Sequence, residues 1–145
     1  MRFMVATELL LEELVGGGAS LSSFPLADLA VGAVTLEWIL ADVEMDTQLH
    51  PSERSKWRTN LTNFRKALIQ AGGTVTAVSE EALERWGKAM LLDLRHGSGT
   101  ASYGMPVEER LIIATAAELG LIYLTSRRDW NDTLQEAFGL SIQEI

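Results

Sequence analysis

Acidic side chains are the residues of this sequence best placed to do chemistry, because several of them come just after a short apolar run or at the start of a helix pattern. These acids are Glu8, Glu37, Glu108, Glu109 and Asp129. The carboxyl ends of parallel strands share one edge of a sheet, so such acids would converge there. Clustered carboxylates are best explained by a hard divalent cation such as Mg²⁺, which activates water against a phosphodiester.

A structural explanation of the same acids stays open beside the metal site. The positive end of the helix dipole favours acidic residues in the first turn of any helix, whatever the function. Composition alone favours this explanation. A magnesium site therefore depends on whether these carboxylates meet in space.

Other catalytic groups receive little support from the sequence. Cysteine is absent, which excludes disulfides, thiolate metal sites and a cysteine nucleophile. His50 and His96 lie far apart in loop-like sequence, where we expect surface residues. The "GSG" at 97–99 lacks the strand and turn of a nucleophile elbow. The glycine-rich stretch 96–105 lacks the spacing of a phosphate-binding loop, and we expect a connection there.

Strand and helix patterns alternate along the chain. Strands are predicted at 3–6, 29–34, 74–78 and 121–126, with a closing edge strand at 140–145. The predicted helices begin at Thr7, Thr35, Pro51, Ser79, Pro106 and Asp129. Four of them end at or before Gly16, Gly72, Gly120 and Phe138, while the helix from Thr35 includes Val43 and the helix from Ser79 extends to Leu94. This alternation predicts an α/β fold, a three-layer α/β/α arrangement with a mostly parallel sheet, formed by residues 1–145 as one domain.

The charge of the chain works against non-specific binding to phosphate backbones. Twenty acidic and twelve basic residues give a formal net charge of −8. The one local basic patch would be formed by Arg54, Lys56, Arg58, Arg65 and Lys66. On an amphipathic helix, such residues are more often a solvated face than a nucleic-acid site. With neither a signal-peptide pattern nor a membrane-spanning run, we expect a cytoplasmic, soluble protein.

Three stretches resemble the PIN domains of VapC-type toxins, the ribonuclease half of toxin-antitoxin pairs. They are "FMVATELLLEEL" at 3–14, "GAVTLEWILADVE" at 32–44 and "YGMPVEERLIIATAAELGLIYLTSRRDW" at 103–130. The last is the most specific, because it is similar to the family's pattern of an acid, a helix, a glycine, a strand and a threonine-led turn. The resemblance extends over essentially the whole chain.

The resemblance implies a central parallel sheet between helices and an acidic site that binds magnesium or manganese for endonucleolytic RNA cleavage. It also implies an antitoxin-like protein partner and, commonly, a homodimer. In order, the four family acids fall on Ala6, Trp38, Glu109 and Arg127. Glu8 takes the place of a family asparagine, and Glu37 is one residue, or about 100°, out of phase with the second acid. Glu109 and the neighbouring Asp129 are the metal ligands that remain if any ion binds.

Three of these substitutions would each weaken a metal site. Alanine offers no oxygen, tryptophan fills the space with an apolar ring, and arginine brings a permanent positive charge. Two hypotheses for Arg127 follow. It acts as a counter-ion paired with Glu109 or Asp129, or it points to solvent beside Arg128.

Three functional hypotheses remain. The first is a PIN-like protein with a degenerate metal site and a retained protein- or RNA-binding role. The alternative is an active Mg²⁺- or Mn²⁺-dependent endoribonuclease whose displaced acidic site uses Glu8, Glu37, Glu109 and Asp129. The third is a receiver-like signalling domain, although phosphoryl transfer to aspartate would need an acid where Ala6 stands.

Overall fold

The sheet of this protein consists of five parallel strands. The computed structural model describes residues 2–16, 20–94 and 104–145. The strands are β1 (Phe3–Val5), β2 (Leu29–Gly32), β3 (Thr74–Thr76), β4 (Ile122–Thr125) and β5 (Ile142–Glu144). Their order is β3-β2-β1-β4-β5 and every pairing is parallel. The predicted strands are confirmed, including β5 at an edge.

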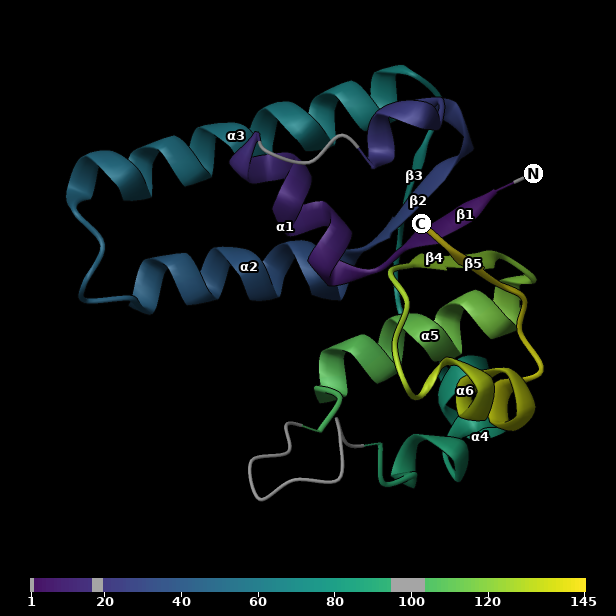
Figure 1. Ribbon diagram of the computed structural model, residues 1–145. Helices are drawn as coiled ribbons and strands as arrows, with labels where there is room; N and C mark the ends of the chain where they lie inside the picture. The colour runs from purple at the N-terminus through teal and green to yellow at the C-terminus, as the bar shows by residue number, and fades with distance from the viewer. Residues whose placement is uncertain (1, 17–19, 95–103) are drawn as a thin grey trace.

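Six α-helices and three short 3-10 turns lie between these strands in the described parts of the chain. The helices are α1 (Thr7–Val15), α2 (Ala33–Met45), α3 (Pro51–Gln70), α4 (Glu80–Trp86), α5 (Val107–Leu119) and α6 (Asn131–Phe138), and the 3-10 turns are Leu21–Ser23, Leu26–Asp28 and Ala89–Leu91. In Figure 1, α1 and α3 lie on one side of the sheet, and α4, α5 and α6 lie on the other. The predicted three-layer α/β/α class is therefore confirmed.

The strand order excludes the receiver-like hypothesis. Receiver domains have the doubly wound order β2-β1-β3-β4-β5, in which the third strand is central. Here β1 is central and lies between β2 and β4. Its Met4 and Val5 are fully buried, as expected for a parallel strand covered on both faces.

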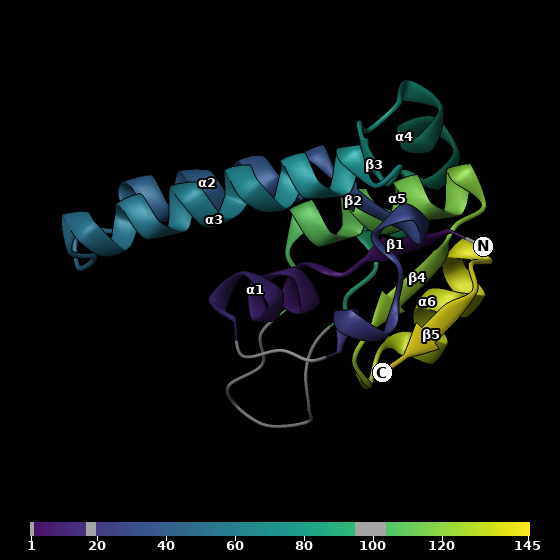
Figure 2. The ribbon, with the colours of Figure 1, turned by 90° about the horizontal axis from the view of Figure 1, so that it is seen from above.

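Helices α2 and α3 form a hairpin that extends beyond the sheet in both ribbon views (Figures 1 and 2). In α3, Leu61 and Leu68 are buried, and the predicted stripe is completed by the partly buried Trp57 and Phe64. Polar contacts join the two helices, since Arg58 forms an ion pair with Glu44. Arg54 donates to the carbonyls of Val43 and Asp46. Two members of the basic patch are thus engaged within the hairpin.

One predicted cap and one predicted helix start are wrong. Helix α1 begins at Thr7 as predicted, but its capping position is Ala6 and not Thr7. Helix α2 begins at Ala33, two residues before the predicted start at Thr35. Thr35 is buried, and its hydroxyl lies 3.5 Å from that of Thr7. Each threonine is therefore turned toward the interior instead of toward the free N–H groups of its own helix.

Gly32 allows α5 to approach the end of β2. A Cβ at this position would lie 2.5 Å from Cγ2 of Ile112, a buried residue of α5. Only a residue without a side chain fits such a contact. The close approach brings the N-terminal half of α5 toward the carboxyl ends of the central strands.

Other local predictions have mixed outcomes. Ser79 caps α4 by accepting from the Ala82 N–H at 3.1 Å, and Gly120 ends α5 with a φ of 67°. Helix α4 is shorter than predicted, because it ends at Trp86 and a 3-10 turn follows instead of a helix to Leu94. Helix α6 begins at Asn131, two residues later than predicted. The predicted connection at 96–105 lies almost wholly outside the described residues.

Candidate functional site

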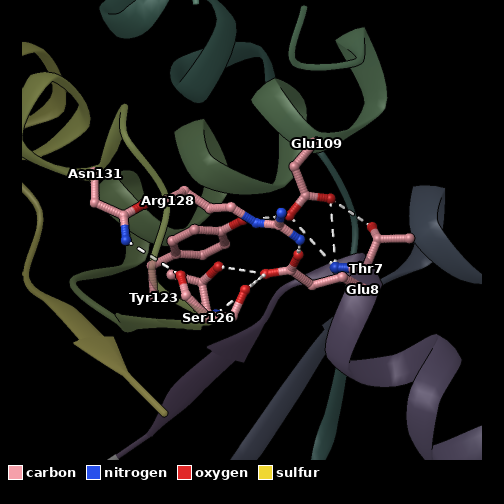
Figure 3. Close-up of polar contacts among 8 residues, drawn as sticks. Thr7, Glu8, Glu109, Tyr123, Ser126, Arg128 and Asn131 are labelled. Carbon is pink, nitrogen blue, oxygen red and sulfur yellow. Dashed lines mark hydrogen bonds and ion pairs between the residues drawn. The ribbon is translucent and has the colours of Figure 1, made fainter. Parts of the chain in front are cut away.

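A cavity opens where α5 meets the carboxyl ends of β1 and β4. Its volume is about 330 Å³. We call it the acidic cavity, because Glu8, Glu108 and Glu109 line it together with Trp38 and Trp130. Figure 3 shows its polar contacts. Parallel strands ending at one edge are the usual position for a ligand site in α/β folds.

Glu109 is the buried carboxylate of this cavity. It lies in the first turn of α5 and is 9% exposed. The Thr7 hydroxyl donates to its Oε2 at 2.5 Å, the Thr7 N–H lies 3.4 Å from both carboxylate oxygens, and the Tyr123 hydroxyl donates to Oε1. Every contact offers a hydrogen atom, so the site is built around an acceptor.

Burial and hydrogen bonding act in opposite directions on this carboxyl. Burial raises the pKa of Glu109, whereas the hydrogen bonds from Thr7 and Tyr123 lower it, and burial has the larger effect. The pKa of Tyr123 is raised well above its usual value, first by burial and then by the charge of Glu109. The Tyr123 hydroxyl therefore remains a hydrogen donor to Glu109.

Glu8 forms the second polar cluster of the cavity. Its Oε1 accepts from the Thr125 hydroxyl at 2.8 Å, the Ser126 N–H at 3.1 Å and the Ser126 hydroxyl at 2.7 Å. Its Oε2 forms an ion pair with Arg128. Glu8 thereby joins the first turn of α1 to the end of β4, 117 and 118 residues away.

An arginine-carboxylate pair lies at this edge of the sheet, and it joins Arg128 to Glu8. Of the two hypotheses for Arg127, the pairing with Glu109 or Asp129 is wrong. Arg127 is exposed, which agrees with the hypothesis that it points to solvent. The segment after β4 is neither helix nor strand. A repeating pattern in the sequence therefore cannot predict which of the two adjacent arginines faces inward.

The other predicted site residues do not join Glu8 and Glu109. Glu37 is exposed and lines a separate cavity between α2 and α3, while its neighbour Trp38 lines the acidic cavity. This agrees with the expected phase difference of one residue. Asp129 is exposed and is not among the side chains lining the cavity. Ala6, at the end of β1, is 1% exposed and offers no polar side-chain atom.

Sequence reasoning missed several residues that position the two carboxylates. Thr7, Tyr123 and Ser126 donate to them, and Asn131 donates to the Ser126 carbonyl at 3.2 Å and to Glu144 at 2.9 Å. The available signal was that Thr125 and Ser126 directly follow an apolar strand. Tyr123 lies within the buried strand β4, and its position in an apolar run gives no sign of its partner.

The residues present do not fit a magnesium or manganese site. The oxygens of Glu8 and Glu109 already accept hydrogen bonds from this chain, and Arg128 places a positive charge beside them. Mg²⁺ takes oxygen ligands in near-octahedral geometry, and the guanidinium beside Glu8 opposes a second cation there. Within residues 2–16, 20–94 and 104–145, no three His, Asp or Glu side chains are arranged to hold a metal ion.

His50 has a structural role. His50 Nδ1 accepts from the Ser52 N–H at 3.1 Å and thereby caps α3. This is a structural role at the surface, as predicted for a lone histidine in a loop. His96 lies outside the described residues.

Comparison with solved structures gives matches over nearly the full length of the chain, and they include the following three. FitAcB from Neisseria gonorrhoeae has a TM-score of 0.62 at 16% identity, covering 97% of this chain and 96% of that chain. VapBC2 from Rickettsia felis, bound to a DNA fragment from its promoter, has a TM-score of 0.67 at 12% identity, covering 100% and 99%. FitAB bound to an IR36 DNA fragment has a TM-score of 0.64 at 15% identity, covering 99% and 94%.

Sequence comparison adds no closer relative. No protein-family model matches the chain, and no curated protein has significant sequence similarity to it. At these low identities, the structural matches establish the fold alone. None of the described helices is long and apolar enough to cross a membrane.

Proposed function

We propose that this chain, which has the fold of the PIN-domain toxins VapC and FitB over its full length, is a toxin-like protein with a degenerate metal site. In this proposal, residues 1–145 form a single PIN-like domain whose retained role is to bind a partner. The acidic cavity lies at the carboxyl ends of the strands, where α/β folds usually place a ligand site. In this proposal, the side chains at the site form hydrogen bonds and an ion pair with each other and do not hold a metal ion.

One observation carries the proposal: the two inward-facing carboxylates each accept hydrogen bonds from groups of this chain, and one of them is also paired with an arginine. Glu8 is bound by Arg128, Thr125 and Ser126, and Glu109 by Thr7 and Tyr123. An ion would have to displace a guanidinium and several donors before it could bind. Arg128 thus acts as an internal counter-ion where a nuclease would hold metal.

An antitoxin-like protein is the partner that the comparisons favour. The matched structures are complexes named FitAB and VapBC2, and two of them hold DNA fragments. By analogy, we assign this chain to the cytoplasm and expect a homodimer that binds a small antitoxin-like protein. The net charge of −8 makes a protein a better partner than RNA.

The alternative function is a metal-dependent endoribonuclease with a displaced acidic site. It is favoured by the grouping of Glu8, Glu108 and Glu109 around one cavity. Such an enzyme would have to release Arg128 from Glu8 before binding Mg²⁺ or Mn²⁺. The nuclease therefore predicts metal-dependent RNA cleavage, whereas the degenerate site predicts none.

An RNA cleavage assay separates the two functions. The purified chain is incubated with single-stranded and structured RNA in Mg²⁺ or Mn²⁺, beside Glu109→Gln. We expect no cleavage above that of the variant. Metal-dependent cleavage that is lost in Glu109→Gln would establish the nuclease and overturn the degenerate site.

A second assay tests the partner. If a short coding sequence lies directly upstream of the gene, its product is expressed together with this chain. We expect a stoichiometric complex on size-exclusion chromatography. Separate elution of the two products at micromolar concentration would count against the antitoxin-like partner.

A further inference from the structure

The acidic cavity combines apolar walls with an excess of negative charge. Leu11, Trp38, Met105 and Trp130 supply apolar surface. The charged side chains that line it are three acidic residues and one arginine, among the residues that the structure describes. An anionic ligand such as a phosphate would be repelled, whereas a cation with an apolar body has favourable contacts with both components.

Glu108 is the carboxylate of the cavity that is still available to a ligand. It is half-buried in the first turn of α5, and within the described parts of the chain it forms no hydrogen bond or ion pair. The other two carboxylates are satisfied by internal donors. A ligand in this cavity therefore meets one free negative charge beside two indole rings.

Among the described residues, few oxygen atoms in the acidic cavity are free to accept hydrogen bonds from a ligand. This limits the kind of cation that the cavity can bind. A primary ammonium needs three acceptors and a guanidinium presents five donors, whereas Mg²⁺ needs several oxygens at once. The hydroxyls of Thr7, Tyr123 and Thr125 all direct their hydrogen atoms to Glu8 or Glu109. A fully alkylated ammonium needs no hydrogen-bond acceptor, and it is attracted both by a carboxylate and by the faces of aromatic rings.

We propose that the acidic cavity binds a small quaternary ammonium ligand, with Glu108 facing its charge and Trp38 and Trp130 contacting its alkyl groups. Trp38 supports this assignment, because 41% of this large apolar side chain remains exposed although it lines the cavity. A bound ligand would cover that surface. The inference does not depend on an antitoxin-like partner or on nuclease activity.

Calorimetric titration with choline tests this inference on the whole chain. Its uncharged tert-butyl isostere, which has the same shape, is the second titrant, and Mg²⁺ is the third. We expect saturable choline binding that is at least tenfold tighter than binding of the isostere. Equal binding of both would show an apolar cavity only, and failure of choline to bind would also overturn the proposal.

Two variants locate the binding. Glu108→Gln should weaken choline about tenfold, while Glu80→Gln, the same change in the first turn of α4, should leave it unchanged. Circular dichroism melting checks that both variants fold. If Mg²⁺ binds and competes with choline in a Glu108-dependent manner, the cavity is a metal site and the proposal is wrong. An equal loss in both variants would also contradict it.

Discussion

Burial and hydrogen bonding have opposite effects on the ionisation of Glu109. Its carboxyl is buried beside the ring of Tyr123, in the first turn of α5. Donors from Thr7 and Tyr123 stabilise the ionised form, but burial outweighs them and raises the pKa. The residue is therefore well bonded and nevertheless costly to ionise.

The raised pKa of Glu109 predicts a pH dependence of stability. Below about pH 4.5, the carboxyl is protonated in both the folded and the unfolded state. As pH rises, the unfolded chain ionises first, so the free energy of unfolding falls until pH passes the raised folded-state pKa. We expect this fall in the natural chain and its absence in Glu109→Gln, measured by urea denaturation at a series of pH values. Parallel pH profiles for the two proteins would refute this account of Glu109.

At the scale of the element, close contacts with glycines set the distances between helices and the sheet. Gly73 connects α3 to β3, and a Cβ there would lie 2.5 Å from the Leu26 carbonyl oxygen and also collide with Leu68. A backbone carbonyl and a buried leucine have little room to move. This turn holds α3 against the sheet and thereby fixes the hairpin of α2 and α3.

Gly73→Ala should destabilise the fold by about 2 kcal/mol, because the new methyl group overpacks a closed contact. Gly120→Ala is the matched control, since that position has no neighbour within 4 Å and a φ of 67°. Its cost should be about 1 kcal/mol, from the left-handed backbone alone. Thermal denaturation of both variants measures the difference, and a Gly120 variant less stable than the Gly73 variant would contradict the packing argument.

The ends of several helices could be predicted from the sequence. Ser79, Pro51 and Gly120 mark helix ends through contacts within a few residues, and these predictions are confirmed. The expected cap at Thr7 is wrong because its hydroxyl is taken by Glu109, 102 residues away. Long-range contacts of this kind leave no local pattern.

The position of the site, although not its detailed contacts, could be predicted from the order of strands and helices. Strand ends at one edge of a parallel sheet brought Glu8 and Glu109 into one cavity, as the alternation of elements predicted. Which arginine pairs with Glu8 was not predictable, because the segment between β4 and α6 has no repeat. Asp129 and Arg127 are exposed for the same reason.

For the whole molecule, the net charge favours a protein over RNA as the proposed partner. The formal net charge is −8, and the acidic cavity adds a local excess of carboxylates. Arg54 and Arg58 of the basic patch are engaged between α2 and α3. Of the five residues of the patch, this leaves Lys56, Arg65 and Lys66 to displace counter-ions from an RNA backbone.

We therefore expect fluorescence anisotropy with labelled single-stranded RNA to show no salt-dependent binding in the absence of divalent ions. Arg65→Gln, at an exposed position of the patch, should change nothing. If RNA does bind, and binding weakens steeply with added salt and with Arg65→Gln, then the α3 patch is a nucleic-acid surface. In that case the partner would be RNA, and the proposal of an antitoxin-like protein partner would be wrong.

The degenerate site requires that the inward-facing carboxylates are bound by this chain's own donors and not by a metal ion. Electron paramagnetic resonance of Mn²⁺ tests that requirement directly, because the free ion gives a signal that bound Mn²⁺ loses. The account predicts that the signal rises linearly from the first addition of Mn²⁺ to the natural chain. Suppression of the signal up to one ion per chain, abolished by both Glu8→Gln and Glu109→Gln, would contradict it.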